Sequence, residues 1–169
     1  MQNICAECHR LGKGCCYFKE SNNNFQMGLF PNDIEKICVE LNVEPDYFIV
    51  KDIVEPDIIK MFSNFNYAFF DVVFKDNVRY KLKIINEKCI FLNDNGCSLP
   101  LNARPLFCRA YPFWLSKNYK NIYVFSSTDC LAQEKSTLNW MLVNEYFNYS
   151  ETYLRNMFEE LKIYFDQKN

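Results

Sequence analysis

Apolar residues recur at intervals of three and four in two stretches of the chain, a spacing typical of amphipathic helices. The first stretch follows Pro31, with Asn32 in the position of an N-cap, and the second follows Ser150. Two shorter helices are predicted over residues 56–64 and 105–111, each with a proline at its first position. The apolar positions of the two long helices are Ile34, Ile37, Cys38 and Leu41 in the first, and Leu154, Met157, Phe158, Leu161, Tyr164 and Phe165 in the second.

Between the helices the hydrophobic pattern changes to a period of two, which is typical of half-buried strands. Residues 67–74 form a dense aromatic and β-branched run, and in residues 78–84 apolar side chains alternate with basic ones. The polar residues 75–77 between these runs predict a hairpin. A second tight turn is predicted at residues 94–96, and a short strand over residues 122–125. Helices combined with hairpins predict an α+β fold.

The first 30 residues follow neither period. They contain three of the four glycines and a polar run at residues 21–24, so we expect an irregular loop there. No repeat, low-complexity tract or charge block divides the chain, and 169 residues suit one hydrophobic core. We therefore predict a single domain spanning residues 1–169, with its cysteine-bearing loops gathered on one side.

Composition and charge narrow the range of partners. Hydrophobic residues make up 49% of the chain, which predicts a well-filled core, and the net charge of −2 gives no general attraction to nucleic acid or anionic membranes. The basic stripe formed by Arg79, Lys81 and Lys83 is more typical of the solvated side of a hairpin than of a nucleic-acid site. No apolar stretch approaches the roughly 20 residues that span a bilayer. We expect neither nucleic acid nor a membrane as a partner.

The amino-terminal sequence bears on the cellular compartment and so on the state of the cysteines. Residues 1–5 contain no basic segment, apolar core or small-residue cleavage site of a signal peptide, so we expect the protein to be cytoplasmic. The cytoplasm keeps thiols reduced. The nine cysteines are therefore expected to bind metal as thiolates rather than to form a disulfide framework.

Eight of the nine cysteines fall into two groups with metal-ligand spacing. The first group reads C-x2-C-x6-C-C and the second reads C-x7-C-x10-C-x21-C. A C-x-x-C pair lets two thiolates reach one metal from a single tight turn, and Gly12 and Gly14 leave the nearby backbone free to wrap around it. The predicted metal ligands are Cys5, Cys8, Cys15, Cys16, Cys89, Cys97, Cys108 and Cys130.

Two details of the cysteine pattern bear on how the metal is held. Cys38 lies on the apolar face of the first helix and is expected to be a small buried hydrophobic residue rather than a ligand. Neighbouring side chains such as Cys15 and Cys16 point to opposite faces of an extended chain, so the pair can serve two separate metals. If the loop turns sharply, the pair can bind one polynuclear cluster instead. Both arrangements stay open.

The sequence around the first pair also matches another metal pattern. Residues 5–9 read C-x-x-C-H, the pattern of covalent haem attachment. Haem attachment generally requires export, which the amino terminus does not predict, and the same two cysteines fit the larger cluster. His9 is the only histidine, and we expect it to face solvent beside the cluster.

Two arginines in the second cysteine group are candidates for neutralising the thiolates. Four thiolates around one zinc leave a net charge of about −2, which needs cations or N–H donors nearby. Helical geometry over residues 105–111 places Arg104 about one turn from Cys108, and Arg109 follows that cysteine directly. We expect both arginines to supply counter-charge, and binding of a substrate anion is the alternative.

The order of the cysteine motifs is similar to that of a known family. The segments that carry the similarity are the C-x-x-C and C-C pairs, Cys89-Ile90-Phe91-Leu92, Gly96-Cys97-Ser98, Arg104-Pro105 and Cys108-Arg109-x-Tyr111-Pro112-Phe113. They resemble the CxxCxxCC, or YkgJ-like, cysteine-cluster family over about residues 5–130, and residues 131–169 lie outside the resemblance. Members are described as zinc- or iron-chelating proteins, which implies that the eight cysteines are the family's cluster. The gap between Cys8 and Cys15 is longer than the family pattern.

Two classes of function follow. The first is a metal-binding protein without catalysis, which holds zinc or an iron–sulfur cluster and stores it, senses it or passes it to a protein partner; thiolate ligation suits both metals. The second is an iron–sulfur-dependent enzyme that modifies a protein side chain with S-adenosylmethionine, because flagellin lysine N-methylases share a related cysteine cluster. The sequence contains no glycine-rich cofactor loop, H-E-x-x-H motif or Ser/His/Asp set, so we favour the first class.

Overall fold

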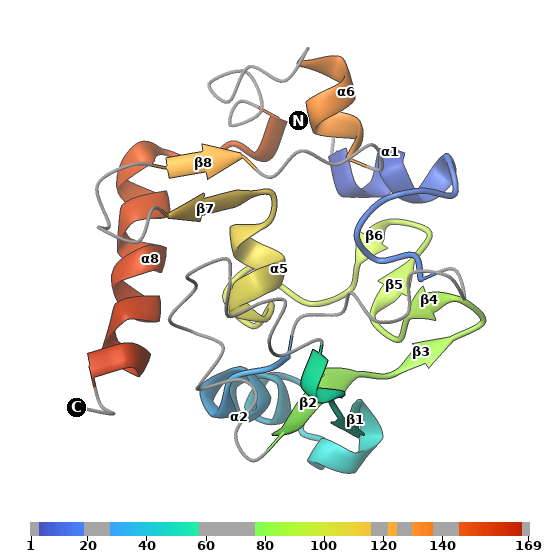
Figure 1. Cartoon of the computed structure of the whole chain (residues 1–169). Coiled ribbons are helices and arrows are strands. Elements are labelled where there is room, and N and C mark those ends of the chain that lie inside the picture. Colours follow the sequence, from blue (N-terminus) through green and yellow to red (C-terminus); the bar gives the residue numbers. More distant parts are fainter. Residues whose placement is uncertain are drawn as a thin grey trace.

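The computed structural model describes residues 4–18, 28–57, 77–115, 122–124, 130–136 and 146–166, and it contains helices and antiparallel strand pairs (Figure 1). The helices are α1 (Ile4–Arg10), α2 (Pro31–Leu41), α5 (Leu106–Ala110), α6 (Leu131–Lys135) and α8 (Glu151–Asp166), with a 3-10 turn at η2 (Pro45–Tyr47). The strand pairs are β1 (Ile49–Ile53) with β2 (Val78–Leu82), β3 (Ile84–Ile85) with β4 (Lys88–Cys89), β5 (Leu92–Asn93) with β6 (Gly96–Cys97), and β7 (Phe113–Leu115) with β8 (Ile122–Val124). The predicted α+β fold is confirmed.

Most predicted elements are present where the structure describes the chain. The helices α2, α5 and α8 match predicted helices, and the turn at residues 94–96 joins β5 to β6. β8 matches the short strand predicted over residues 122–125, of which residue 125 is not described. The helix predicted over residues 56–64 is described only at residues 56–57, which are helical. The strand predicted over residues 67–74 lies outside the described residues.

The prediction of an irregular loop over the first 30 residues is wrong near its start, where α1 forms. The two cysteines of the C-x-x-C pair are three positions apart, a spacing that puts them on one face of a helix. Ile4 buries the beginning of this helix in the core. The helix is followed by a turn in which the N–H of Gly12 donates to the His9 carbonyl at 2.9 Å, and Gly12 has a left-handed φ of 64°.

Buried side chains form two hydrophobic clusters. The first cluster lies among α1, α5, α6 and α8, and it consists of Ile4, Phe30, Val54, Leu106, Phe107, Ala110, Phe113, Cys130, Leu131, Ala132, Leu154, Met157 and Phe158. The second lies among α2, η2 and the strands β2 to β6, and it consists of Leu29, Ile37, Phe48, Leu82, Cys89, Phe91 and Leu99. α2 connects the clusters, because Phe30 at its start belongs to the first and Ile37 in its middle to the second.

The first turn of α2 is capped by Asp33 and not by the predicted Asn32. Phe30 occupies the N-cap position with extended backbone, and its N–H donates to Asp33 Oδ2 at 3.0 Å. The phenylalanine at the N-cap has no side-chain oxygen to accept an N–H of the first turn, and the Asp33 carboxylate at N3 contributes the other half of a capping box by accepting the N–H of the N-cap residue. Burial raises the pKa of Asp33 to about 6, although the N–H groups of Phe30 and Leu106 lower it.

The basic stripe of β2 does not lie on a solvated face as predicted. Arg79 is buried, with 3% of its surface exposed, and it donates to Asp52 Oδ2 from Nε at 2.9 Å and Nη2 at 2.7 Å. Lys81 Nζ lies 3.1 Å from the same carboxylate oxygen, and Lys83 donates to the Asp46 carbonyl. Asp52 belongs to β1, a strand that the hydrophobic pattern did not predict and that pairs with β2 in antiparallel register. The positive charges of this stripe are therefore engaged by contacts within the protein.

Replacing Arg79 with alanine should lower the free energy of unfolding by about 1–3 kcal/mol, since a buried charged hydrogen-bonding partner of Asp52 is lost. Chemical denaturation measures this change. Lys51→Ala is the matched control on β1, because Lys51 is exposed and its loss should change stability by less than about 0.5 kcal/mol. Equal effects of the two substitutions would contradict a structural role for the buried guanidinium.

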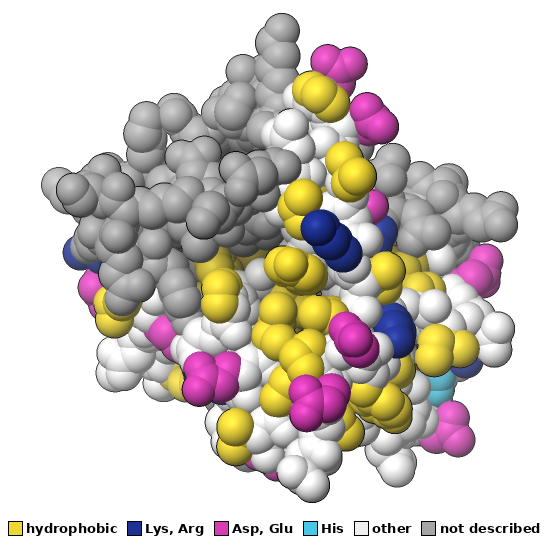
Figure 2. All heavy atoms as spheres, turned by 90° about the horizontal axis from the view of Figure 1, so that it is seen from below, with side chains coloured by type: hydrophobic (Ala, Val, Ile, Leu, Met, Phe, Trp, Pro, Cys, Tyr) yellow, Lys and Arg dark blue, Asp and Glu magenta, His cyan; other side chains and the backbone are white. Residues whose placement is uncertain are grey.

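The lower face of the molecule carries hydrophobic and acidic side chains. Figure 2 views the molecule from below Figure 1, and hydrophobic side chains gather near the middle of this face with acidic ones around them. The exposed apolar residues of α2, η2, β1 and β2 are Val39, Leu41, Tyr47, Val50, Ile53 and Tyr80. Across the ranges that the structure describes, no helix combines the length and the apolar composition needed to cross a membrane.

Candidate metal centre

All eight cysteines of the two sequence groups line one cavity, which is partly open to solvent, with Cys15 and Cys108 exposed at it. The ninth, Cys38, is not among the lining residues and packs half-buried against the second hydrophobic cluster. The cavity encloses about 70 Å³, whereas one water needs roughly 10–15 Å³, so a group of several atoms fits inside. The division of the cysteines into eight and one, which the sequence predicted from spacing, is thus also a spatial division.

The eight cysteines come from six segments that surround the cavity. They are Cys5 and Cys8 on α1, Cys15 and Cys16 in the following loop, Cys89 on β4, Cys97 on β6, Cys108 on α5 and Cys130 at the N-cap of α6. Three of them, Cys5, Cys8 and Cys130, pack with the first hydrophobic cluster, and Cys16, Cys89 and Cys97 pack with the second. The cavity therefore lies at the junction of the two clusters.

The loop after α1 folds back tightly on the first cysteine pair. Gly14 has a φ of 111°, and a Cβ atom at this position would lie 3.2 Å from Cys8 Cβ and 3.5 Å from Cys8 Sγ. Only glycine fits this close approach without strain. The loop then passes beside the distant strand β4, whose Cys89 N–H donates to the Cys16 carbonyl at 2.9 Å. This path brings the C-C pair of the first cysteine group beside Cys89 of the second group.

Cys15 and Cys16 face the same centre, because their thiols are hydrogen-bonded to each other. The sharp turn of the loop, and not an extended chain, therefore sets their directions. The hydrogen bond from Cys16 and the charge of Arg104 lower the pKa of Cys15, while the same hydrogen bond raises the pKa of Cys16. Cys15 is the thiol that is most readily ionised within the pair.

The pKa values of the seven other thiols that line the cavity are raised, and Cys15 contributes to the increase at each of them. Burial is the main cause at all of them except Cys16, where the hydrogen bond with Cys15 comes first, and it raises the pKa of Cys5 and of Cys89 to about 12. Repulsion from a Cys15 thiolate raises the pKa further at Cys5, Cys8, Cys16, Cys89, Cys97, Cys108 and Cys130. Cys15 therefore lies within electrostatic range of all seven. Eight thiols in this cavity cannot ionise together unless a cation compensates their charge.

The backbone is arranged to stabilise thiolates at four of these positions. N–H groups donate to sulfur and lower the thiol pKa against the larger effect of burial. The donors and their acceptors are Phe91 to Cys89, Leu99 to Cys97, Leu131 to Cys8, and Ala132 and Gln133 to Cys130. Three of the acceptors receive the N–H of the residue two positions later in the chain. This local geometry orients each sulfur before any ligand is bound.

The two arginines predicted as counter-charge occupy different environments. Arg104 lines the cavity, and its charge lowers the pKa of the thiols Cys5, Cys15 and Cys97 against the effect of burial at each. Its Nε donates to the Leu99 carbonyl at 2.9 Å, which fixes the side chain. Arg104 is thus placed where the predicted counter-charge is needed.

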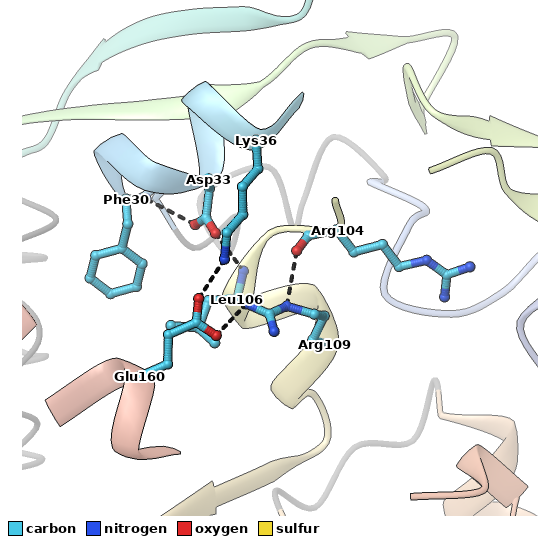
Figure 3. Close-up of polar contacts among 7 residues, drawn as sticks. All are labelled: Phe30, Asp33, Lys36, Arg104, Leu106, Arg109 and Glu160. Carbon is cyan, nitrogen blue, oxygen red and sulfur yellow. Dashed lines mark hydrogen bonds and ion pairs between the residues drawn. The ribbon is translucent and has the colours of Figure 1, made fainter. Parts of the chain in front are cut away.

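Arg109 does not line the cavity and extends toward α8. Its Nη2 lies 3.0 Å from Glu160 Oε2, and its Nε donates to the Arg104 carbonyl at 3.1 Å (Figure 3). With 7% of its surface exposed, Arg109 is buried between α5 and α8. We therefore keep the counter-charge prediction for Arg104 and assign Arg109 to the packing of α5.

His9 is not solvent-facing as predicted, since only 9% of its side chain is exposed. It lines the cavity together with Tyr17, whose hydroxyl lies 2.7 Å from His9 Nδ1. His9 Nε2 lies 3.3 Å from Asp94 Oδ1 on the opposite side of the ring. Lys13, which also lines the cavity, lowers the pKa of Cys8 against burial. Sequence reasoning missed Tyr17 and Lys13, for which proximity to the C-C pair was the only available signal.

The thiols are gathered but are not yet at metal-ligand distances. Among the described residues, no three Cys, His, Asp or Glu side chains form a group already able to hold a metal ion. Zn–S bonds are about 2.3 Å long, so metal binding requires the sulfurs to turn toward a common point. A cysteine has one side-chain torsion with three staggered positions, and rotation among them moves the sulfur without moving the backbone.

Comparison with models of known protein families, with curated proteins and with solved structures found no match. The similarity to the CxxCxxCC family therefore stays a prediction that rests on the cysteine pattern.

Proposed function

We propose that the protein binds metal in one shared centre, formed by the thiolates of the eight cysteines. The observation that carries this proposal is that the eight cysteines with metal-ligand spacing line a single cavity, while Cys38 lies elsewhere. Zinc ions and an iron–sulfur cluster both suit thiolate ligands. Bound zinc would cross-link the surrounding segments, whereas an iron–sulfur cluster would add one-electron chemistry.

A single centre fits the cavity better than two separate sites of four thiolates. The thiols of Cys15 and Cys16 contact each other, and Cys15 is within electrostatic range of the cysteines of both hydrophobic clusters. Sulfur can bridge two metals, so a central thiolate can serve ligand groups on both of its sides. The volume of about 70 Å³ accommodates several atoms.

The remaining residues of the cavity prepare it for the charge of the thiolates. Arg104 and Lys13 bring positive charge, and backbone N–H groups donate to four of the sulfurs. These groups stabilise the ionised form that binds metal, while burial keeps the free thiols protonated. Metal binding should therefore release protons and proceed better as the pH rises. Thiol ligands require a reducing compartment, and we place the protein in the cytoplasm for that reason.

Metal analysis of protein purified without oxygen tests the proposal. We expect at least two metal ions per chain, either zinc without inorganic sulfide or iron with it. Thiol titration on the same sample should give about one reactive thiol per native chain, assigned to Cys38, and nine after denaturation with a chelator. A folded, metal-free chain with nine freely reactive thiols would overturn the proposal. One metal ion per chain would overturn the polynuclear centre alone.

A further inference from the structure

Asp33 is a buried carboxylate that connects two helices far apart in the sequence. Only 3% of its surface is exposed. Its Oδ2 accepts the N–H of Phe30 at 3.0 Å, and its Oδ1 accepts the N–H of Leu106 at 2.9 Å (Figure 3). Each carboxylate oxygen thus receives one backbone donor, the first from the start of α2 and the second from the start of α5.

α5 depends on this distant carboxylate for the cap at its amino terminus. Its N-cap residue is Pro105, whose side chain has no oxygen or nitrogen to offer the first turn. The first N–H groups of a helix have no partner within the helix, so Asp33 supplies what the local sequence cannot. A helix of only five residues gains little from its own hydrogen bonds, and its position is set by such external contacts.

The position of α5 determines where two groups of the candidate metal centre lie. Arg104 precedes the helix, Cys108 lies within it, and both line the cavity. In Figure 3 the side chain of Arg104 extends away from the contacts of Asp33, Arg109 and Glu160. The residue bonded to Asp33, Leu106, lies midway between Arg104 and Cys108 in the chain.

An ion pair also ties α5 to α8. Arg109 and Lys36 both contact Glu160, one from α5 and the other from α2. Although burial raises it, the hydrogen bonds and charges of Lys36 and Arg109 lower the pKa of Glu160 overall. These contacts tie α2, α5 and α8 together. In Figure 3 Arg109 also bonds the Arg104 carbonyl just before α5, but that contact lies between residues 104 and 109 themselves, whereas Asp33 ties an N–H of the first turn of α5 to another helix.

We propose that Asp33 is a positioning residue of the metal centre, whose carboxylate holds the start of α5 so that Cys108 and Arg104 face the cavity. This inference rests on the proposed function. Asn at position 33 preserves the size of the side chain but replaces one oxygen with an N–H donor. That donor would face the N–H of Phe30 or of Leu106, so one of the two helix starts loses its partner.

Residue-resolved alkylation of the metal-loaded protein, read by mass spectrometry, tests the proposal. In Asp33→Asn, metal affinity should fall by roughly 10–100-fold, the range seen when a group that orients a metal ligand is lost, and the alkylation rate of Cys108 should rise as its thiol leaves the metal more often. Cys5 and Cys8, which lie on α1, should keep the rates of the wild type at early times. A parallel competition with a chelator should show faster loss of metal from the variant.

Two controls separate positioning from general destabilisation. Asp52→Asn removes a carboxylate that binds Arg79 and Lys81 away from α5. Lys36→Met alters α2 close to Asp33 without touching the start of α5. Both control variants should leave the alkylation rate of Cys108 unchanged. The comparison is repeated with denaturant added to each control until its free energy of unfolding equals that of Asp33→Asn, and the rate should still not rise.

The outcomes are distinguishable. A selective rise at Cys108 in Asp33→Asn alone supports the positioning role. A uniform rise at all cysteines, a similar rise in the controls, or no rise at all overturns it while the metal centre stands. If Asp33→Asn does not fold, Asp33→Glu replaces it, and an unchanged rate at Cys108 in that variant overturns the proposal. Wild-type protein without metal overturns both the inference and the proposed function.

Discussion

Replacing Cys15 with alanine is expected to remove most of the bound metal, the largest loss among the single cysteine variants. Its thiol contacts Cys16 and interacts electrostatically with the six other cysteines of the cavity. If Cys15 bridges metals in the proposed centre, its loss removes more than one bond. Metal content per chain, measured after gel filtration with a competing chelator, should fall below half of the wild-type value.

Cys38→Ala is the matched control for this experiment. Cys38 is half-buried against the second hydrophobic cluster and lies outside the cavity. Its replacement should leave metal content unchanged and cost about 1 kcal/mol or less of stability, as expected for a group the size of a methyl. Equal loss of metal from Cys15→Ala and Cys38→Ala would contradict the assignment of the eight ligands.

Replacing Arg104 with alanine should weaken metal binding by roughly 10–100-fold, the usual effect of removing a group that supports metal ligands. The guanidinium stabilises thiolates at Cys5, Cys15 and Cys97, and its loss leaves their charge less compensated. Lys at this position should restore part of the affinity, because a point charge supplies the attraction without the hydrogen bond geometry. Competition with a chelator of known affinity measures the change.

Arg109→Ala provides the complementary result. Arg109 binds Glu160 outside the cavity, so its loss should lower the free energy of unfolding by about 1–3 kcal/mol and leave metal stoichiometry unchanged. The pair of variants separates counter-charge from packing, since one should change metal affinity and the other stability. If Arg109→Ala reduced metal affinity as strongly as Arg104→Ala, the different roles of the two arginines would be contradicted.

The features that were predictable from the sequence are those encoded by local spacing. The apolar face of α8 places Leu154, Met157 and Phe158 in the core, as its helical period predicts. The separation of Cys38 from the other cysteines followed from its place on the face of α2. In both cases residues within a few positions of one another carry the information, because helix periodicity depends on neighbours only.

The features that escaped prediction depend on contacts between distant residues. The pairing of β1 with β2 buries Arg79, because Asp52 lies opposite it in the register. In the sequence Asp33 looks like an ordinary first-turn residue of a helix, because its second contact is to Leu106 of α5, which is far away in the chain. The different roles of the two arginines likewise depend on the position of α8, which no spacing around residues 104–109 reveals.

The eight cysteines are spread from residue 5 to residue 130, so they become available one after another while the chain is synthesised. Cys5, Cys8, Cys15 and Cys16 leave the ribosome together, while Cys130 follows more than a hundred residues later. At roughly 5–20 residues per second, the early four thiols wait on the order of ten seconds for the last one. During that interval these four thiols lack the walls of the cavity and, until residue 104 has been made, the charge of Arg104. If these thiols capture metal at that stage, it must be rearranged as the later segments close around it, and the first metal site of the growing chain would then differ from the proposed final centre.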